Sequence, residues 1–178
     1  MILAGDWTSV SWSPDGQRLV ITGYADKREA ENPQADAYTV APDGSAVTKL
    51  TDDAPYEHWA AWSPDGATIA YVVSEGYDDV DYRSDVFVAD ADGSNAHRVT
   101  TWAGFDSFPV WSPDGEWLAF ASDRDATLEQ QRANRDDQAF AWISTYVMRP
   151  DGSDLRPMLI SRAGETILPS SWVPSSTA

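Results

Sequence analysis

The sequence predicts an all-β protein made of three repeats of four strands and one further strand. Three observations predict it: a recurring motif, a second motif in phase with it, and the strand pattern between them. The string Trp-Ser-Pro-Asp-Gly occurs at 12–16, 62–66 and 111–115, with its tryptophans 50 and 49 residues apart. A degenerate fourth copy contains Trp172, and the string Asp-Gly-Ser recurs at 43–45, 92–94 and 151–153. A period of this length indicates a repeat architecture.

Each repeat divides into four short strands, the first of which ends at the tryptophan. Ser-Pro-Asp-Gly then forms a tight turn, because proline presets its own φ angle while aspartate and glycine suit the positions that follow. The second strands are short and apolar, at 18–22, 68–73 and 117–121. The third strands lie at 37–41, 86–90 and 145–149, and an Asp-Gly turn leads to fourth strands at 47–50, 97–99 and 156–159. Four short strands in each repeat of this length are typical of a β-propeller blade.

We therefore expect residues 1–178 to form a single β-propeller domain. Its expected parts are blade 1 at about 5–51, blade 2 at about 55–100, blade 3 at about 104–160 and an extra strand at about 166–174. Closed propellers have four to eight blades, so three blades make an open half-propeller with exposed sheet faces, which favour association.

Two explanations of the half-propeller stay open. Two copies could form a homodimer with a six-bladed ring, or the chain could be part of a longer gene product. We favour the homodimer, because Met1 stands where a blade begins and the last residues are rich in Ser, Thr and Ala.

Composition excludes several classes of partner. The chain has 12 basic and 29 acidic residues, a formal net charge of −17, so it repels nucleic acid and anionic membrane surfaces. The same charge also serves solubility in general. There is no cysteine, which excludes disulfides and thiolate metal sites. The sequence shows neither a signal peptide pattern nor an apolar segment near the roughly 18 residues that span a bilayer, and the residues leave the compartment open.

The motifs resemble the TolB-type, WD-repeat-like propeller blades. The resemblance is carried by Trp-Ser-Pro-Asp-Gly followed by the strand at 117–121, and by the third and fourth strands within 85–100. It covers essentially the whole chain and implies a propeller fold in a periplasmic or extracellular protein. It does not specify an activity, because such blades occur both in periplasmic scaffolds and in the gating domains of serine peptidases.

The topology of a blade predicts where a ligand binds. All long insertions, at 23–36, 74–85 and 122–144, connect strands at one face, whereas the opposite face carries only tight turns. Loops on a rigid scaffold often carry binding residues, and here acids alternate with aromatics. A short helix is expected within 127–137. The candidate binding residues on this face are Tyr56, His58, Trp59, Tyr77, Asp78, Asp79, Asp81, Tyr82, Trp102, Phe105, Asp106, Asp123 and Asp125.

The repeated motifs themselves are interpreted as structural. We expect the tryptophans to fill the gaps between blades, the aspartates to accept hydrogen bonds from turn amides, and the glycines to complete the turns. These residues are Trp12, Asp15, Gly16, Trp62, Asp65, Gly66, Trp111, Asp114, Gly115 and Trp172.

No motif predicts catalysis. The sequence has no Gly-x-Ser-x-Gly elbow and no phosphate-binding glycine loop, and its only histidines are His58 and His97. No cofactor or metal is expected. Ca²⁺ could use the carboxylates at 78–81 and 123–125, although solvated loop acids are the simpler interpretation. We therefore expect a non-catalytic interaction scaffold that binds a protein or peptide, with the propeller part of a larger peptidase, lyase or hydrolase as the alternative.

Overall fold

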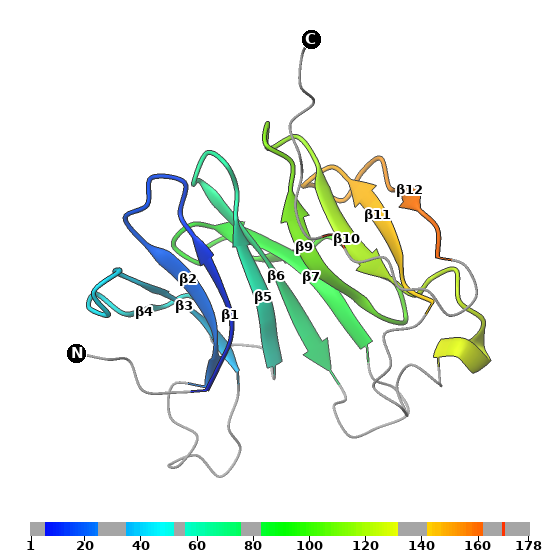
Figure 1. The fold of residues 1–178 in the computed structure, drawn as a ribbon, viewed down its shortest axis with the longest axis horizontal. Helices are drawn as coiled ribbons and strands as arrows, with labels where there is room; N and C mark the ends of the chain where they lie inside the picture. Colours follow the sequence, from blue (N-terminus) through cyan, green and yellow to red (C-terminus); the bar gives the residue numbers. More distant parts are fainter. Residues whose placement is uncertain are drawn as a thin grey trace.

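Three antiparallel four-stranded sheets are arranged like blades of a fan (Figure 1). The structure is a computed structural model and describes residues 6–24, 35–51, 56–75, 83–131, 142–161 and 169. Blade 1 contains β1 (Asp6–Trp12), β2 (Leu19–Tyr24), β3 (Asp36–Val40) and β4 (Thr48–Lys49). Blade 2 contains β5 (Tyr56–Trp62), β6 (Thr68–Glu75), β7 (Arg83–Asp90) and β8 (His97–Arg98). Blade 3 contains β9 (Asp106–Trp111), β10 (Leu118–Ser122), β11 (Ser144–Met148) and β12 (Arg156–Leu159).

The strands of each blade lie in chain order, which confirms the expected half-propeller. The first strand of each blade contacts the first strand of the next, so β1, β5 and β9 form the inner edge of the fan (Figure 1). The middle strands are largely buried, and blade 2 packs between blades 1 and 3. This arrangement explains why β2, β6 and β10 are almost continuously apolar.

Two apolar layers hold the blades together. Between blades 1 and 2, Val20 packs with Trp62, Ile69 and Tyr71. The second layer lies between blades 2 and 3 and includes Val72, Val86, Leu118, Phe120 and Met148. Phe120 and Leu118 are fully buried, so the second interface has a dense hydrophobic centre.

The motif turns use the same hydrogen bonds in each blade. In the first, the Ser13 hydroxyl donates to the Asp15 carboxylate over 2.6 Å, and the Gln17 amide donates to the same oxygen over 3.0 Å. Ser63 with Asp65 and Ser112 with Asp114 repeat this pattern. These hydrogen bonds lower the pKa values of the three aspartates. The motif acids therefore stabilise turns.

The motif tryptophans differ in exposure according to their place in the fan. Trp62 and Trp111 are buried between blades, with 6% and 8% of their surface exposed, whereas Trp12 is 57% exposed. The indole nitrogen of Trp111 donates to the carbonyl of Ala61 in the preceding blade over 3.1 Å. Trp12 has no preceding blade within the described residues. Trp172 and nearly all of the expected extra strand, 166–174, lie outside the described residues.

The two ends of the blades carry different connections. The tight turns after β1, β5, β9 and β11 lie at the upper end in Figure 1. The strand ends that border the long insertions lie at the lower end, which we call the loop end. Within the part of the chain that the structure describes, no helix has the length and apolar character needed to cross a membrane.

Candidate functional site

The inner strands carry a cluster of aromatic rings near the loop end. Trp59 and Phe108 both stand three residues before a motif tryptophan, in β5 and β9. Their φ angles are +50° and +54°, in the left-handed region that bulky residues rarely adopt. The strand registers shift at both places, which identifies a β-bulge in each inner strand. The bulges bring the two rings together across the junction of blades 2 and 3, with centroids 4.2 Å apart.

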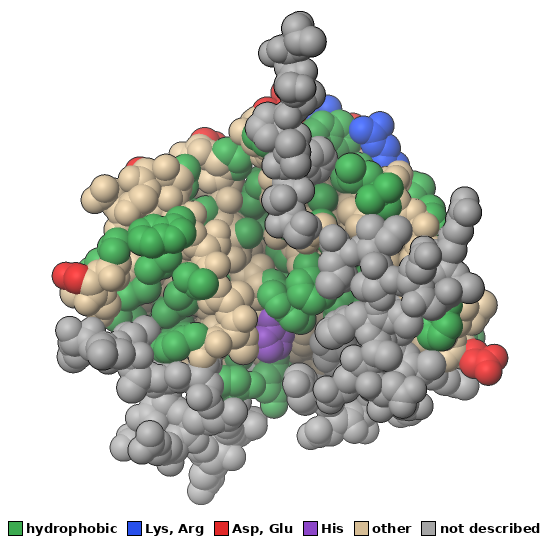
Figure 2. Space-filling view, in the orientation of Figure 1, with side chains coloured by type: hydrophobic (Ala, Val, Ile, Leu, Met, Phe, Trp, Pro, Cys, Tyr) green, Lys and Arg blue, Asp and Glu red, His purple; other side chains and the backbone are tan. Residues whose placement is uncertain are grey.

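Two further rings extend this contact along the inner strands. His58 lies 5.3 Å from Trp59, and Phe105 lies 6.1 Å from Phe108, between ring centroids. All four side chains are partly exposed, and we call His58, Trp59, Phe105 and Phe108 the aromatic wall. Figure 2 shows hydrophobic side chains beside a histidine on the face that carries the inner strands. Burial lowers the pKa of His58, so this imidazole is neutral at physiological pH.

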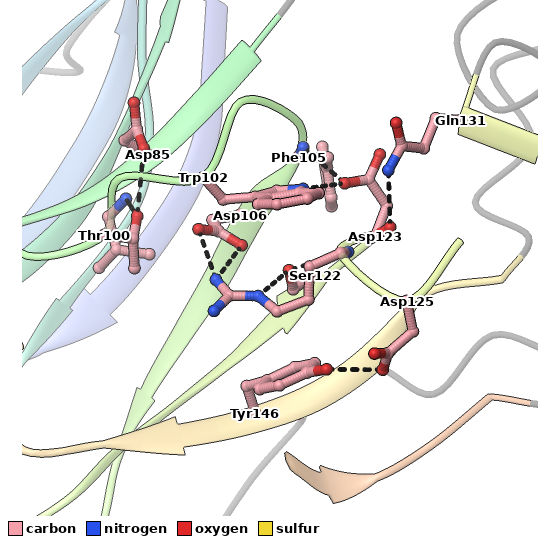
Figure 3. A network of polar contacts seen from close by, with 12 residues as sticks. Asp85, Thr100, Trp102, Phe105, Asp106, Ser122, Asp123, Asp125, Gln131 and Tyr146 are labelled. Carbon is pink, nitrogen blue, oxygen red and sulfur yellow. Dashed lines mark hydrogen bonds and ion pairs between the residues drawn. The ribbon is translucent and has the colours of Figure 1, made fainter. Parts of the chain in front are cut away.

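A buried ion pair lies next to the aromatic wall, directly after Phe105 in the chain. Asp106 is fully buried, and one guanidinium nitrogen of Arg124 lies 2.9 Å from both of its carboxylate oxygens (Figure 3). Arg124 also donates to the Ser122 hydroxyl over 2.8 Å and stacks over Tyr146 at 4.6 Å. Burial raises the pKa of Asp106, and the positive charge of Arg124 opposes that rise. Asp106 therefore holds β9 in place and presents no surface to a ligand.

Asp123 and Asp125 also form contacts within blade 3. Asp123 accepts hydrogen bonds from the Trp102 indole over 3.0 Å and from the Phe105 amide over 2.9 Å (Figure 3). These two bonds fix one end of the aromatic wall. Asp125 accepts a hydrogen bond from the Tyr146 hydroxyl over 2.6 Å, and together with burial this raises the pKa of Tyr146.

A helical turn follows these acids. The expected helix within 127–137 is present at 128–131, and the rest of that range lies outside the described residues. The Thr127 amide donates to the Gln130 side chain over 2.8 Å, and the Gln130 amide contacts the Thr127 hydroxyl at 3.3 Å. These reciprocal bonds form a capping box. The Gln131 side chain then donates to the Asp123 carbonyl over 3.1 Å, which connects the turn to the site.

The remaining candidate residues fall into two groups. Tyr56 begins β5 and is partly exposed, next to Glu57, which is only 2% exposed. Tyr77, Asp78, Asp79, Asp81 and Tyr82 lie outside the described residues. In the described ranges no group of three or more acidic, histidine or cysteine side chains could hold a metal ion. The suggested Ca²⁺ site at 78–81 lies outside these ranges and stays a prediction.

Sequence reasoning missed Phe108 and Glu57. The signal for Phe108 was its spacing, because it precedes Trp111 by the same three residues that separate Trp59 from Trp62. Glu57 precedes Trp62 by five residues, as Asp106 precedes Trp111, so the repeat also places two acids at one position. A single acid beside a strand gives no indication in the sequence that it is buried.

A shallow groove lies at the other end of the inner strands. It has a volume of about 390 Å³ and is lined by uncharged residues, among them Trp12, Pro14, Pro64, Pro109 and Val110. The candidate binding residues of the loop end do not line it.

Comparison with known proteins agrees with this architecture. A sequence model of the WD40 family (WD domain, G-beta repeat) matches residues 4–28. A structure assigned as TolB from Agrobacterium tumefaciens has a TM-score of 0.66 and 24% identity, over 93% of this chain and 53% of that one. The repeats are TolB-type, WD-like propeller blades. TolB from Acinetobacter baumannii has a TM-score of 0.60 and 20% identity, over 93% of this chain and 35% of that one.

Enzymes are also among the similar structures. A puromycin-hydrolyzing peptidase from Mycobacterium tuberculosis has a TM-score of 0.65 and 18% identity, over 88% of this chain and 22% of that one. No curated protein is significantly similar in sequence. The chain thus spans about half of the Agrobacterium structure and about a third of the Acinetobacter one.

Proposed function

We propose that the chain is a non-catalytic binding scaffold whose aromatic wall contacts a protein or peptide partner. The observation that carries this proposal is the pair of stacked rings at Trp59 and Phe108, each held in an unfavourable backbone conformation at the inner edge of the fan. Backbone strain of this kind clusters at binding sites and active sites. Partly exposed aromatic side chains are also the residues that most often anchor protein interfaces.

The charges around the wall suggest the chemistry of the partner. The wall has no cation of its own when His58 is neutral, and the net charge of the chain is −17. In the sequence, the insertions at 23–36 and 74–85 are rich in Asp and Glu. A partner segment with an apolar side chain for the wall and basic residues beside it fits this combination, because opposite charges steer association.

Selection from a displayed random-peptide library tests the proposal. Peptides selected on the parent chain should lose at least about tenfold in affinity for a Phe108→Leu variant, which is the cost of roughly 1.4 kcal/mol of lost aromatic contact. Trp117→Leu is the matched control, because Trp117 lies against Arg149 and Arg156, away from the wall. Failure to select peptides, or equal affinity for the parent and Phe108→Leu, would contradict the proposal.

Similarity to enzymes supports a second candidate function, the propeller part of a larger peptidase or lyase. Solved structures of a puromycin-hydrolyzing peptidase and of an oligogalacturonate lyase share this fold. Sequencing the encoding gene beyond Ala178 distinguishes the two functions. A hydrolase or lyase domain encoded in the same reading frame would overturn the scaffold proposal.

The exposed face of blade 1 supports the proposal of self-association. Val10 and Trp12 are 65% and 57% exposed, and Val10 lines a groove of about 390 Å³. None of the residues that line this groove is charged; they include Trp7, Leu19, Ile21, Val40 and Pro42. Blade 1 covers the equivalent face of blade 2, where Trp62 is only 6% exposed. A blade of a second copy therefore fits this face, and the two copies together supply six blades. The solution mass of the chain tests this.

A further inference from the structure

The junction of blades 1 and 2 contains a buried carboxyl group that has no ion-pair partner among the described residues. Glu57 begins the part of β5 that leads to His58 and Trp59, and only 2% of its surface is exposed. Its carboxylate accepts hydrogen bonds from the Thr51 hydroxyl and from the Ala37 amide, the latter over 3.0 Å. Both donors belong to blade 1 or directly follow it, so this one side chain connects the two blades at the loop end.

The backbone reinforces the same connection. The Glu57 amide donates to the Ala35 carbonyl over 2.8 Å, and Ala35 forms a parallel bridge with Tyr56. Blades 2 and 3 repeat this bridge between Ser84 and Phe105. The two junctions thus share the same parallel bridge, so their buried acids can be compared directly.

The charges at the two junctions differ. At the second junction Asp106 pairs with Arg124, which compensates its negative charge. At the first junction the nearby base is Lys49, whose ammonium lies 3.1 Å from Asp36. Among the described residues, no basic group lies within ion-pair distance of Glu57. A buried carboxylate without a compensating cation is costly, so the neutral form is favoured.

The groups facing Glu57 increase this preference. Asp36 is only 6% exposed, and its Oδ1 atom has no hydrogen-bond partner within the described ranges. Its other oxygen accepts from the Tyr38 hydroxyl over 3.1 Å. Burial and the negative charge of Asp36 raise the pKa of Glu57 to about 7, although Thr51, Ala37 and Lys49 act in the opposite direction. Burial and the negative charge of Asp36 also raise the pKa of Tyr38 to about 12.

We propose that Glu57 is a proton-controlled joint between blades 1 and 2. In its neutral form it holds the loop ends of the two blades together; ionisation places a second negative charge beside Asp36 and loosens this junction. The start of β5, which carries His58 and Trp59, loosens with it. The joint would thereby regulate the binding site proposed above, and only this functional consequence rests on that proposed function.

The sign of the effect follows from linkage between protonation and folding. The folded state keeps the Glu57 proton up to about pH 7, whereas the unfolded chain releases it near the ordinary value of 4.5. Folding therefore binds a proton between these values, and stability falls as the pH rises through this window. The contribution is fully present below the unfolded value and is lost above about pH 7.

Urea unfolding of the parent and of Glu57→Gln, from pH 5 to pH 8, tests the proposal. Glutamine resembles the neutral acid and cannot ionise. The unfolding equilibrium constant of the parent should rise, relative to that of Glu57→Gln, by roughly fiftyfold to a hundredfold across this range. Glu129→Gln is the matched control, because it removes one exposed acid and should leave the pH dependence of the parent unchanged.

A second measurement keeps the proposal testable if Glu57→Gln fails to fold. The carboxyl carbon of Glu57 in the parent should titrate by NMR near pH 7, and amides of β5 and of 35–37 should exchange faster above that pH. Titration of the Glu57 carboxyl near pH 4.5 would overturn the proposal. So would a parallel pH dependence of unfolding for the parent and Glu57→Gln. Neither readout uses a ligand, so their failure is distinct from a failure of the proposed binding function.

Discussion

Trp59 and Phe108 hold a backbone conformation that costs an ordinary residue about 1–2 kcal/mol. Their ring contacts offset this cost, because the two rings stack and Trp59 packs against the buried layer between blades 2 and 3. Each bulge therefore depends on its ring: without the ring contact, nothing offsets the strain of the left-handed backbone. This balance explains how large side chains occupy positions that usually favour glycine.

Substitution of Phe108 by glycine and by alanine separates the strain from the packing. Both changes remove the ring, but only glycine adopts a φ of +54° without strain. We expect Phe108→Gly to be more stable than Phe108→Ala by about 1 kcal/mol in urea unfolding, the reverse of the usual order in strands. Val147, in β11, is the control position, where alanine should be the more stable replacement. An advantage for alanine at position 108 would show that the bulge is not strained.

At the scale of elements, the repeated turns pack against the preceding blade. Gly93 ends the Asp-Gly turn of blade 2 with a φ of +87°, and a Cβ atom there would lie 2.2 Å from the Leu50 carbonyl oxygen at the end of blade 1. Gly152 stands in the same relation to Val99, with a distance of 2.8 Å. The Asp-Gly motif thus serves two purposes: it turns the chain and lets neighbouring blades approach closely.

Alanine substitutions at Gly93 and Gly16 test this second purpose. Both glycines have a positive φ, but a Cβ atom at Gly16 would meet nothing within 4 Å. Gly16→Ala should cost only the backbone strain, about 1 kcal/mol, in urea unfolding. Gly93→Ala should cost at least about 1 kcal/mol more, because the Leu50 backbone must move. Equal losses would mean that the turn of blade 2 does not limit the approach of blade 1.

The elements show which features the sequence makes predictable. The motif turns and the four strands of each blade could be predicted because local chemistry determines them: proline and glycine define the turn, and apolar runs define the strands. The bulges at Trp59 and Phe108 could not, since one extra residue in a strand leaves no mark on the pattern of residue types. The burial of Asp106 could not be predicted either, because its partner Arg124 is 18 residues away, in the connection that follows β10.

At the scale of the whole molecule, the described part of the chain forms a fan whose first face is open. The interface between blades 1 and 2 shows what covers such a face, namely another blade with apolar side chains in register. Exposed contiguous apolar surface of this kind is typical of interaction sites. The chain is acidic, but the groove on this face has no charged lining, so two copies can meet there without direct repulsion.

The proposed interface between copies, on the first face of the three-bladed arc, is tested most directly by the solution mass. Light scattering coupled to size-exclusion chromatography, at several concentrations, should give a species of twice the 19.5 kDa chain mass. Val10→Glu places a charge on the open face and should give a single chain, whereas Ala96→Glu, at an exposed turn residue of the central blade 2, should leave the pair intact. A parent that stays a well-folded single chain at every concentration would contradict the claim.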